Sequence, residues 1–136
     1  MIQRIQTIWL LLAGITSLAS IRLPFYSGQL ITDNSYKTLT GSSTILILLT
    51  TVAVATLSFV CIFLYHNRQL QIRISAGAIL LECVTIFLYF KEMKLFSTGT
   101  FALSSVIEVL ILLFLVLSIR SIRHDEKIVK DSNRLR

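Results

Sequence analysis

The sequence has little charge, one proline, five glycines and two cysteines. Only 15% of its 136 residues are charged, against about 25% in ordinary globular proteins, whereas 54% are hydrophobic. The scarcity of proline and glycine argues against a fibrous or disordered chain. A chain of this length cannot bury so much apolar surface within itself, which argues against an ordinary soluble enzyme and indicates a membrane protein.

Motifs that carry known chemistry are also missing. There is no glycine-rich phosphate loop, nucleophile elbow or zinc-protease motif, so we expect no enzyme activity and no cofactor. Cys61 and Cys83 belong to no CxxC or His/Cys cluster and lie about 10 Å apart in predicted depth, which excludes a disulfide and disfavours a metal site. The formal net charge is +6, but the basic residues are not interleaved with stacking aromatics, so we expect no nucleic-acid partner.

Charged residues separate four long apolar runs. The first two are uncharged and the last two carry one glutamate each; they cover residues 5–21, 38–65, 74–90 and 95–119. A membrane-spanning helix needs about 20 mostly apolar residues, and an open strand edge could not satisfy its backbone in hydrocarbon. The sequence therefore predicts an all-α, integral membrane four-helix bundle. We expect one domain, residues 1–136, with helices at about 5–22, 43–65, 72–90 and 99–120, an outer loop at 23–42 and a tail at 121–136 that extends the fourth helix.

The first run has a second interpretation. Arg4, the apolar stretch 8–15 and the small residues at 17–20 resemble a secretory signal with a cleavage site. The run stays apolar through Ile21 instead of turning polar, so we expect a helix that is retained.

The distribution of basic residues predicts how the helices are oriented. With four spans, both termini and the 67–71 turn share one side, and that side carries nine of the 13 basic residues. Basic residues in short loops favour the cytoplasm. We therefore expect both termini in the cytoplasm.

Two acidic residues, Glu82 and Glu108, lie near the middle of their apolar runs, so we expect both at the bilayer midplane and facing the bundle interior. No basic residue lies within these spans to neutralise them. Two carboxylates about 4 Å apart would repel by about 4 kcal/mol at an effective dielectric constant near 20, so we expect at least one to be protonated. The candidate intramembrane site comprises Glu82, Glu108, Thr85, Ser104 and Ser58. It could be a proton- or cation-coupled site, hydrogen-bonding glue between helices, or the partner of a basic residue in another subunit.

The two ends of the chain carry a family resemblance. The opening residues 1–12 (MIQRIQTIWLLL) and the closing segments 122–127 and 131–136 resemble a bacterial inner-membrane family, the domain-of-unknown-function family four-two-nine-three. The resemblance implies a multi-pass protein of the bacterial cytoplasmic (inner) membrane with four spans, and it implies no activity. It also indicates a cytoplasmic contact surface formed by Gln3, Arg4, Gln6, Arg134, Leu135 and Arg136.

Three functions follow as hypotheses, and one of them is a lipid-binding scaffold that would hold acidic headgroups beside Arg120, Arg123 and Lys127. The other two are more specific. The first is an accessory or interaction subunit of a membrane complex that uses its cytoplasmic ends. The second is a small proton- or cation-coupled carrier or channel, a homo-oligomer, with Glu82 and Glu108 as its coupling site. We also expect contact with the lipid bilayer, with anionic headgroups beside the tail residues Arg120, Arg123 and Lys127.

Overall fold

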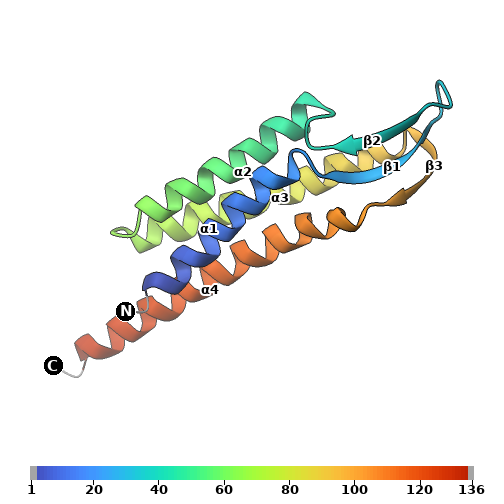
Figure 1. Ribbon diagram of the computed structural model, residues 1–136. Coiled ribbons are helices and arrows are strands. Elements are labelled where there is room, and N and C mark those ends of the chain that lie inside the picture. The colour runs from blue at the N-terminus through green and yellow to red at the C-terminus, as the bar shows by residue number, and fades with distance from the viewer. Residues whose placement is uncertain (1–2, 135–136) are drawn as a thin grey trace.

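The computed structural model describes the backbone of residues 3–134 and the side chains of residues 5–129 and 131. Four helices form a bundle, and three short strands form a sheet at one end of it (Figure 1). The helices are α1 (Gln3–Ser20), α2 (Ile45–Phe63), α3 (Arg68–Met93) and α4 (Val106–Arg134), with a short 3-10 helix, η1 (Leu103–Ser105), before α4. The strands are β1 (Pro24–Leu30), β2 (Tyr36–Thr40) and β3 (Phe96–Phe101). The start of α1, the end of α4 and the α2–α3 turn lie at the end opposite the sheet.

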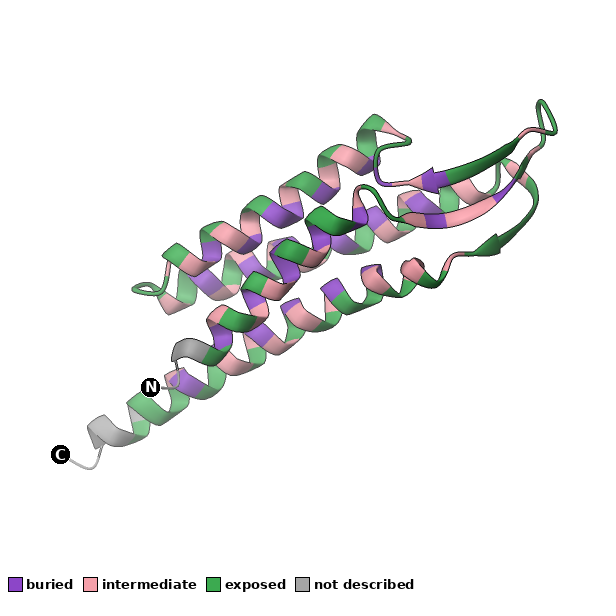
Figure 2. Ribbon diagram, viewed as in Figure 1, coloured by how far each residue is buried: buried purple, intermediate pink, exposed green. Residues whose placement is uncertain are grey.

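The four helices pack side by side in the order α1, α2, α3, α4, and α4 packs back against α1. α1 and α3 each contact both α2 and α4, and the shared core is built from small and branched side chains of all four helices (Leu10, Ala13, Val54, Cys61, Ala78, Ile111 and Leu115). Figure 2 shows the buried residues on the inward sides of the helices and exposed residues on their outward sides. The predicted four-helix bundle is therefore present within the described residues.

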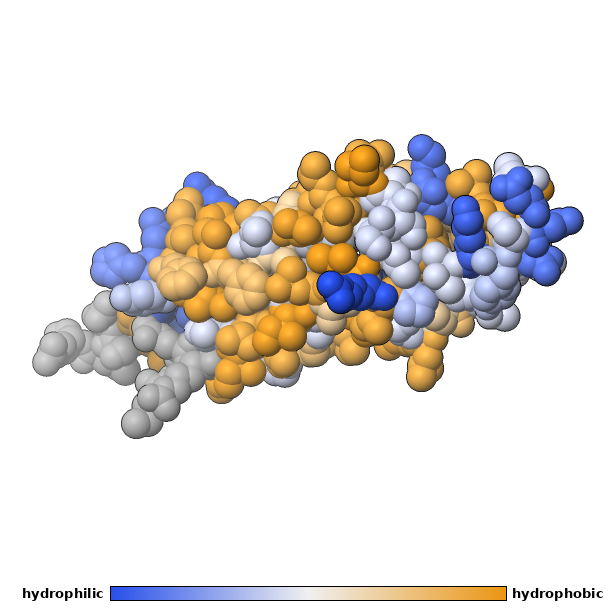
Figure 3. Space-filling view, turned by 45° about the horizontal axis from the view of Figure 1, so that its top comes forward, coloured by the Kyte–Doolittle hydropathy of each residue, from blue (hydrophilic) through white to orange (hydrophobic). Residues whose placement is uncertain are grey.

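Much of the apolar surface faces outward. Three segments are long and apolar enough to cross a membrane: Ile45–Phe63, Arg68–Met93 and Leu103–Val129. No more than 33% of the apolar window in each is buried inside the protein. The apolar part of α1, Ile5–Ser20, is shorter. Figure 3 shows the result as a broad hydrophobic band over the helices, with hydrophilic residues gathered at the sheet end and at the opposite end.

The all-α prediction is wrong at the sheet. The strands lie in the order β2-β1-β3 and are antiparallel throughout. The expected outer loop at 23–42 is instead the β1–β2 hairpin, whose turn contains Asn34 at φ 49°, a conformation that asparagine tolerates better than most residues. Pro24 stands at the first position of β1, where a missing N–H is tolerated.

The predicted start of the fourth helix is also wrong. Residues 96–101 form β3, and α4 begins only at Val106. The strand was not predicted because it lies within the apolar run 95–119, and hydrophobicity alone does not distinguish a short apolar strand from part of a helix. The other end matches better, since α4 continues without a break to Arg134 and so forms the expected extension. α3 is longer than expected because Asn67 caps its start by accepting a hydrogen bond from the Leu70 N–H.

A second apolar cluster joins the sheet to the bundle. Phe25 and Leu39 from the sheet pack against Ile47 of α2 and Tyr89 of α3. The rings of Phe25 and Tyr89 are stacked, with centroids 4.3 Å apart. This cluster holds the sheet over the open end of the four helices, directly above the site described next.

Candidate functional site

The structure brings Glu82 and Glu108 together. Glu82 lies near the middle of α3, whereas Glu108 lies in the first turn of α4. Their carboxyl groups are close enough to interact directly. Glu108 therefore lies near the start of its helix and not in its middle, because β3 and η1 occupy the first part of the apolar run 95–119.

α3 extends well past Glu82 toward the sheet end of the bundle. Beyond Glu82 it continues to Met93, about 16 Å at 1.5 Å per residue, and runs alongside the sheet (Figure 1). α4 starts two residues before Glu108, after the chain has returned through β3. The acid pair thus lies at the sheet end of the bundle.

Two hydroxyl groups adjoin the pair. Ser20, the last residue of α1, and Tyr89, two turns after Glu82 on α3, both lie within interaction range of the Glu108 carboxyl. The phenol oxygen of Tyr89 also lies beside the backbone of Gly41, where a Cβ would stand 3.2 Å from it. Groups from α1, α3, α4 and the β2–α2 connection therefore converge on one polar spot.

The spot is closed to solvent and incompletely hydrogen-bonded. Glu82 is 0% exposed and Glu108 is 3% exposed. Within the described residues, both carboxyl oxygens of Glu82, one of Glu108 and the hydroxyl of Tyr89 have no hydrogen bond of good geometry. No described lysine, arginine or histidine interacts with either carboxyl. Because a buried carboxylate needs a compensating charge, this arrangement suits a pair that holds a proton or a small cation.

The sheet covers the site. Phe25 and Leu39 lie above Tyr89, and Ser104 fixes the start of α4 to β1 by donating a hydrogen bond to the Pro24 carbonyl oxygen. Ser104 thus joins two elements of the cover and does not reach the acids, contrary to its expected role in the site.

The other two predicted members of the site, Thr85 and Ser58, both donate their hydroxyl hydrogen bonds to backbone carbonyl oxygens of their own helices. Thr85 is buried on the same face of α3 as Glu82, but its hydroxyl donates to the Leu81 carbonyl oxygen at 3.0 Å. Ser58 donates to the Val54 carbonyl oxygen at 2.8 Å. Near the end of α1, Ser17 donates a hydrogen bond to the Thr51 carbonyl oxygen of α2. Ser58 follows Thr51 by seven residues, so it lies about 10 Å further from the sheet end of the bundle than this contact. Ser58 is therefore not part of the acid cluster.

Sequence reasoning missed Ser20 and Tyr89. Tyr89 follows Glu82 by seven residues, which places both on one helix face, and that spacing could have identified it. Its side chain is 0% exposed. No local signal identifies Ser20, because its proximity to Glu108 arises only from the packing of α1 on α4.

The predicted cytoplasmic contact surface lies mostly beyond what the structure describes. The side chains of Gln3, Arg4 and Arg134, and all of Leu135 and Arg136, fall outside the described residues. Gln6 is described and is 2% exposed. Its side chain packs inside the bundle and does not lie on the exposed surface of the structure.

Comparison with known proteins supplies a family and no activity. The family model described as Domain of unknown function (DUF4293) matches residues 2–135. No curated protein and no solved structure matches the chain.

Proposed function

The chain belongs to this family of unknown function, as the residues at its two ends predicted. Because the family has no assigned activity, we propose a function from the geometry of the acid pair. We propose that the protein is a four-span membrane protein in which Glu82 and Glu108 bind and release a proton, as a small proton-coupled carrier or channel. The observation that supports it is the contact between two fully buried carboxyls from different helices with no basic partner among the described residues.

The surface of the bundle supports the membrane part of the proposal. Three segments have the length and composition of membrane spans, and their outward sides are apolar. Arg68, Arg73, Arg120, Arg123 and Lys127 lie toward the end opposite the sheet. Because cytoplasmic ends are rich in basic residues, we place that end in the cytoplasm and the sheet outside, and we propose the bacterial cytoplasmic membrane as the location.

A proton is the ion that fits this donor set best. Two carboxyls, a phenol and a hydroxyl converge, and among the described residues no group of three or more His, Cys, Asp or Glu comes together. Divalent ions such as calcium need six to eight oxygen ligands, more than this set offers. One proton shared between the carboxyls removes a repulsion of about 4 kcal/mol, at about 4 Å and an effective dielectric constant near 20.

Release of that proton requires the site to open. Toward the outside, the stacked rings of Phe25 and Tyr89 lie between the acids and the sheet surface. In our proposal, the hairpin moves away from α3 to admit water, and Tyr89, whose hydroxyl has no hydrogen-bond partner among the described residues, donates to the carboxylate that forms.

Proton flux in reconstituted vesicles tests the proposal. The protein is placed in liposomes that enclose a pH-sensitive dye, and a potassium gradient with valinomycin drives protons inward. We expect flux above that of empty liposomes for the wild type, and loss of that flux for Glu82→Gln and Glu108→Gln. Glu92→Gln is the matched control, because Glu92 lies on the same helix outside the site.

Two outcomes would refute the proposal. Wild-type flux equal to that of empty liposomes would reject transport, and full flux in both glutamine variants would leave the acids as structural hydrogen-bonding groups. Flux that depends on sodium, at constant proton gradient, would assign the site to a monovalent cation instead.

A second candidate, the accessory subunit, is favoured by the free end of α4. The helix continues past the start of α1 (Figure 1), and it exposes Ile128 and Val129, 41% and 45% respectively, beside charged residues. A short apolar patch on a projecting helix suits a contact with a cytoplasmic partner or a second copy of the chain. Truncation after Arg123 should release a partner that is retained by the full chain in gentle detergent, and should leave proton flux unchanged. Equal partner recovery from both chains would reject this role.

A further inference from the structure

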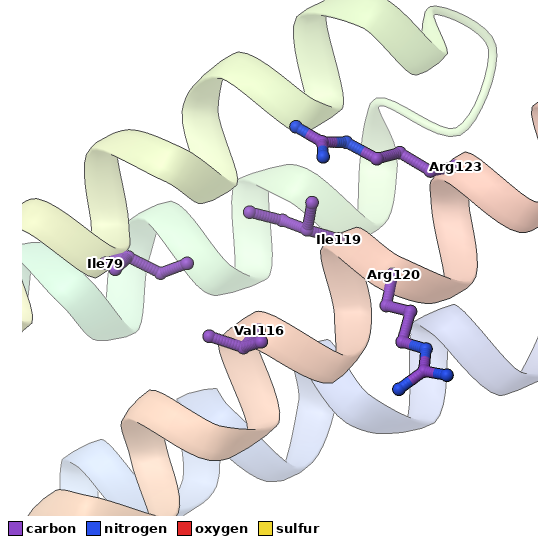
Figure 4. Close-up of a pocket in the computed structure, with 5 residues that line it drawn as sticks. All are labelled: Ile79, Val116, Ile119, Arg120 and Arg123. Atoms are coloured by element: carbon purple, nitrogen blue, oxygen red, sulfur yellow. The ribbon is translucent and has the colours of Figure 1, made fainter.

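A groove between α3 and α4 begins about one turn of α3 from Glu82 and extends toward the end opposite the sheet. Its volume is about 230 Å³, and it is lined by Ile79 from α3 and by Val116, Ile119, Arg120 and Arg123 from α4 (Figure 4). In Figure 4, Ile79, Val116 and Ile119 form its apolar part, and the side chain of Arg123 extends from α4 toward α3. Arg120 stands on the opposite rim and points away from α3.

A second, polar hollow adjoins this groove. It measures about 470 Å³ and is lined by Gln69, Ile72, Arg73, Arg123 and Glu126. Arg123 belongs to both hollows, so they meet at its side chain. Ile72 precedes Ile79 by seven residues on α3, which places the polar hollow about 10 Å closer to the cytoplasmic end.

The charges of the polar hollow favour an anion. Arg73 on α3 and Arg123 on α4 both line it, and both are exposed residues. Glu126 is the one acidic group among the described residues that line it, so two positive side chains border the hollow against one negative side chain. Two guanidinium groups that flank a hollow match the oxygens of a phosphate, because each guanidinium presents a planar fork of N–H donors.

The apolar groove indicates what carries that phosphate. At about 30 Å³ for one water in the liquid, 230 Å³ holds roughly eight water volumes, which is enough for a segment of hydrocarbon chain and not for a whole lipid. Val116 is 46% exposed, so the groove opens along the surface that our proposal places against the acyl chains. A phospholipid in one leaflet would place its headgroup at the arginines and one acyl chain in the groove.

We propose that this groove binds an anionic phospholipid of the cytoplasmic leaflet, with the phosphate at Arg73 and Arg123 and an acyl chain along Ile79, Val116 and Ile119. The inference rests on the membrane orientation proposed above and is independent of the acid pair. The bound lipid ties α3 to α4 at the end of the bundle that the sheet does not hold.

Native mass spectrometry of the full chain in mild detergent tests the site. The protein is mixed with phosphatidylglycerol, or with phosphatidylcholine, and lipid retained on the protein is measured. We expect phosphatidylglycerol to be preferred. We expect retention to fall about fivefold for Arg73→Gln or Arg123→Gln and roughly 25-fold for both, which corresponds to about 1 kcal/mol per basic residue near the lipid surface. Arg68→Gln is the matched control, because Arg68 lies at the same end of α3 and lines neither hollow.

A second pair of variants tests the groove without changing charge. Val116→Trp fills the apolar part and should reduce lipid retention at least fivefold, whereas Val60→Trp should not. Val60 is the matched control, since it is 44% exposed on α2, which does not border the groove.

Each adverse outcome has a distinct meaning. Equal retention in the arginine pair and the Arg68 control, or equal retention of both lipids, would overturn the lipid site. Displacement of phosphatidylglycerol by inorganic phosphate with no effect of Val116→Trp would show a free-anion site instead, and a co-purifying protein that blocks lipid binding would show a protein groove. Failure of the protein to sediment with membranes would reject the membrane proposal itself, and loss of proton flux in Glu82→Gln with lipid retention intact would leave the lipid site standing.

Discussion

The acid pair predicts that stability depends on pH in a way that one amide substitution abolishes. Glu82 and Glu108 are almost fully buried, so water screens little of the repulsion between them once both are ionised. That repulsion is about 4 kcal/mol at about 4 Å and an effective dielectric constant near 20. A total stability of about 5–15 kcal/mol is typical of proteins, so the loss would be large. Raising the pH removes the shared proton, and the folded state should therefore become less stable as pH rises.

The test compares thermal unfolding midpoints in detergent micelles, followed by circular dichroism at a series of pH values. At roughly 4 °C per kcal/mol for a chain of this size, we expect the wild-type midpoint to fall by on the order of 10 °C between mildly acidic and alkaline pH. Glu82→Gln and Glu108→Gln should each flatten this dependence, because the amide keeps the shape of the side chain and supplies a permanent N–H donor to the remaining carboxyl. Glu92→Gln should keep the wild-type slope. Parallel pH curves for the wild type and both site variants would refute the reasoning.

Other predictions concern the sheet, its cover and the membrane. Gly28→Ala should lower the unfolding midpoint and separate β1 from β3, because the added Cβ would clash with the Thr98 carbonyl oxygen of β3. Gly77→Ala is the control, since its Cβ would meet nothing within 4 Å, and it should be neutral or stabilising by up to about 1 kcal/mol. Thermal unfolding of both variants tests this. Phe25→Ala should lower the free energy of unfolding by about 3–5 kcal/mol, because Phe25 is buried and stacked against Tyr89. Phe25→Leu should lower it by less. Equal losses of stability for the two variants in the same thermal assay would contradict a role for ring stacking. In sealed vesicles, Cys83 should resist a charged, water-soluble thiol reagent although its side chain is exposed on the protein, because it faces lipid; rapid labelling there would place that surface of α3 in water.

Some of the candidate site was within reach of the sequence. Charged side chains are so costly in hydrocarbon that Glu82 and Glu108 were expected to face inward, and both are buried. The helical spacing of seven residues also places Tyr89 on the face of Glu82. Ser104 and Ser58 were wrongly assigned because helical periodicity was extended to residues whose backbone or depth differs: Ser104 lies in η1, and Ser58 lies too deep in α2.

The sequence by itself determined that four apolar segments form helices and that one end of the bundle is basic, because run length and charge are local properties of the chain. Only the tertiary structure decided that residues 96–101 form a strand, since the pairing partner of β3 lies about 70 residues away in β1, as in the hydrogen bond from Ser97 to Gln29. That strand shortens α4 and brings Glu108 to its first turn, under the sheet and against Glu82. The α3–α4 groove likewise exists only because two helices distant in sequence pack with Arg73 and Arg123 at one end. Pairing and packing between distant segments depend on the geometry of the whole fold, which no local pattern encodes.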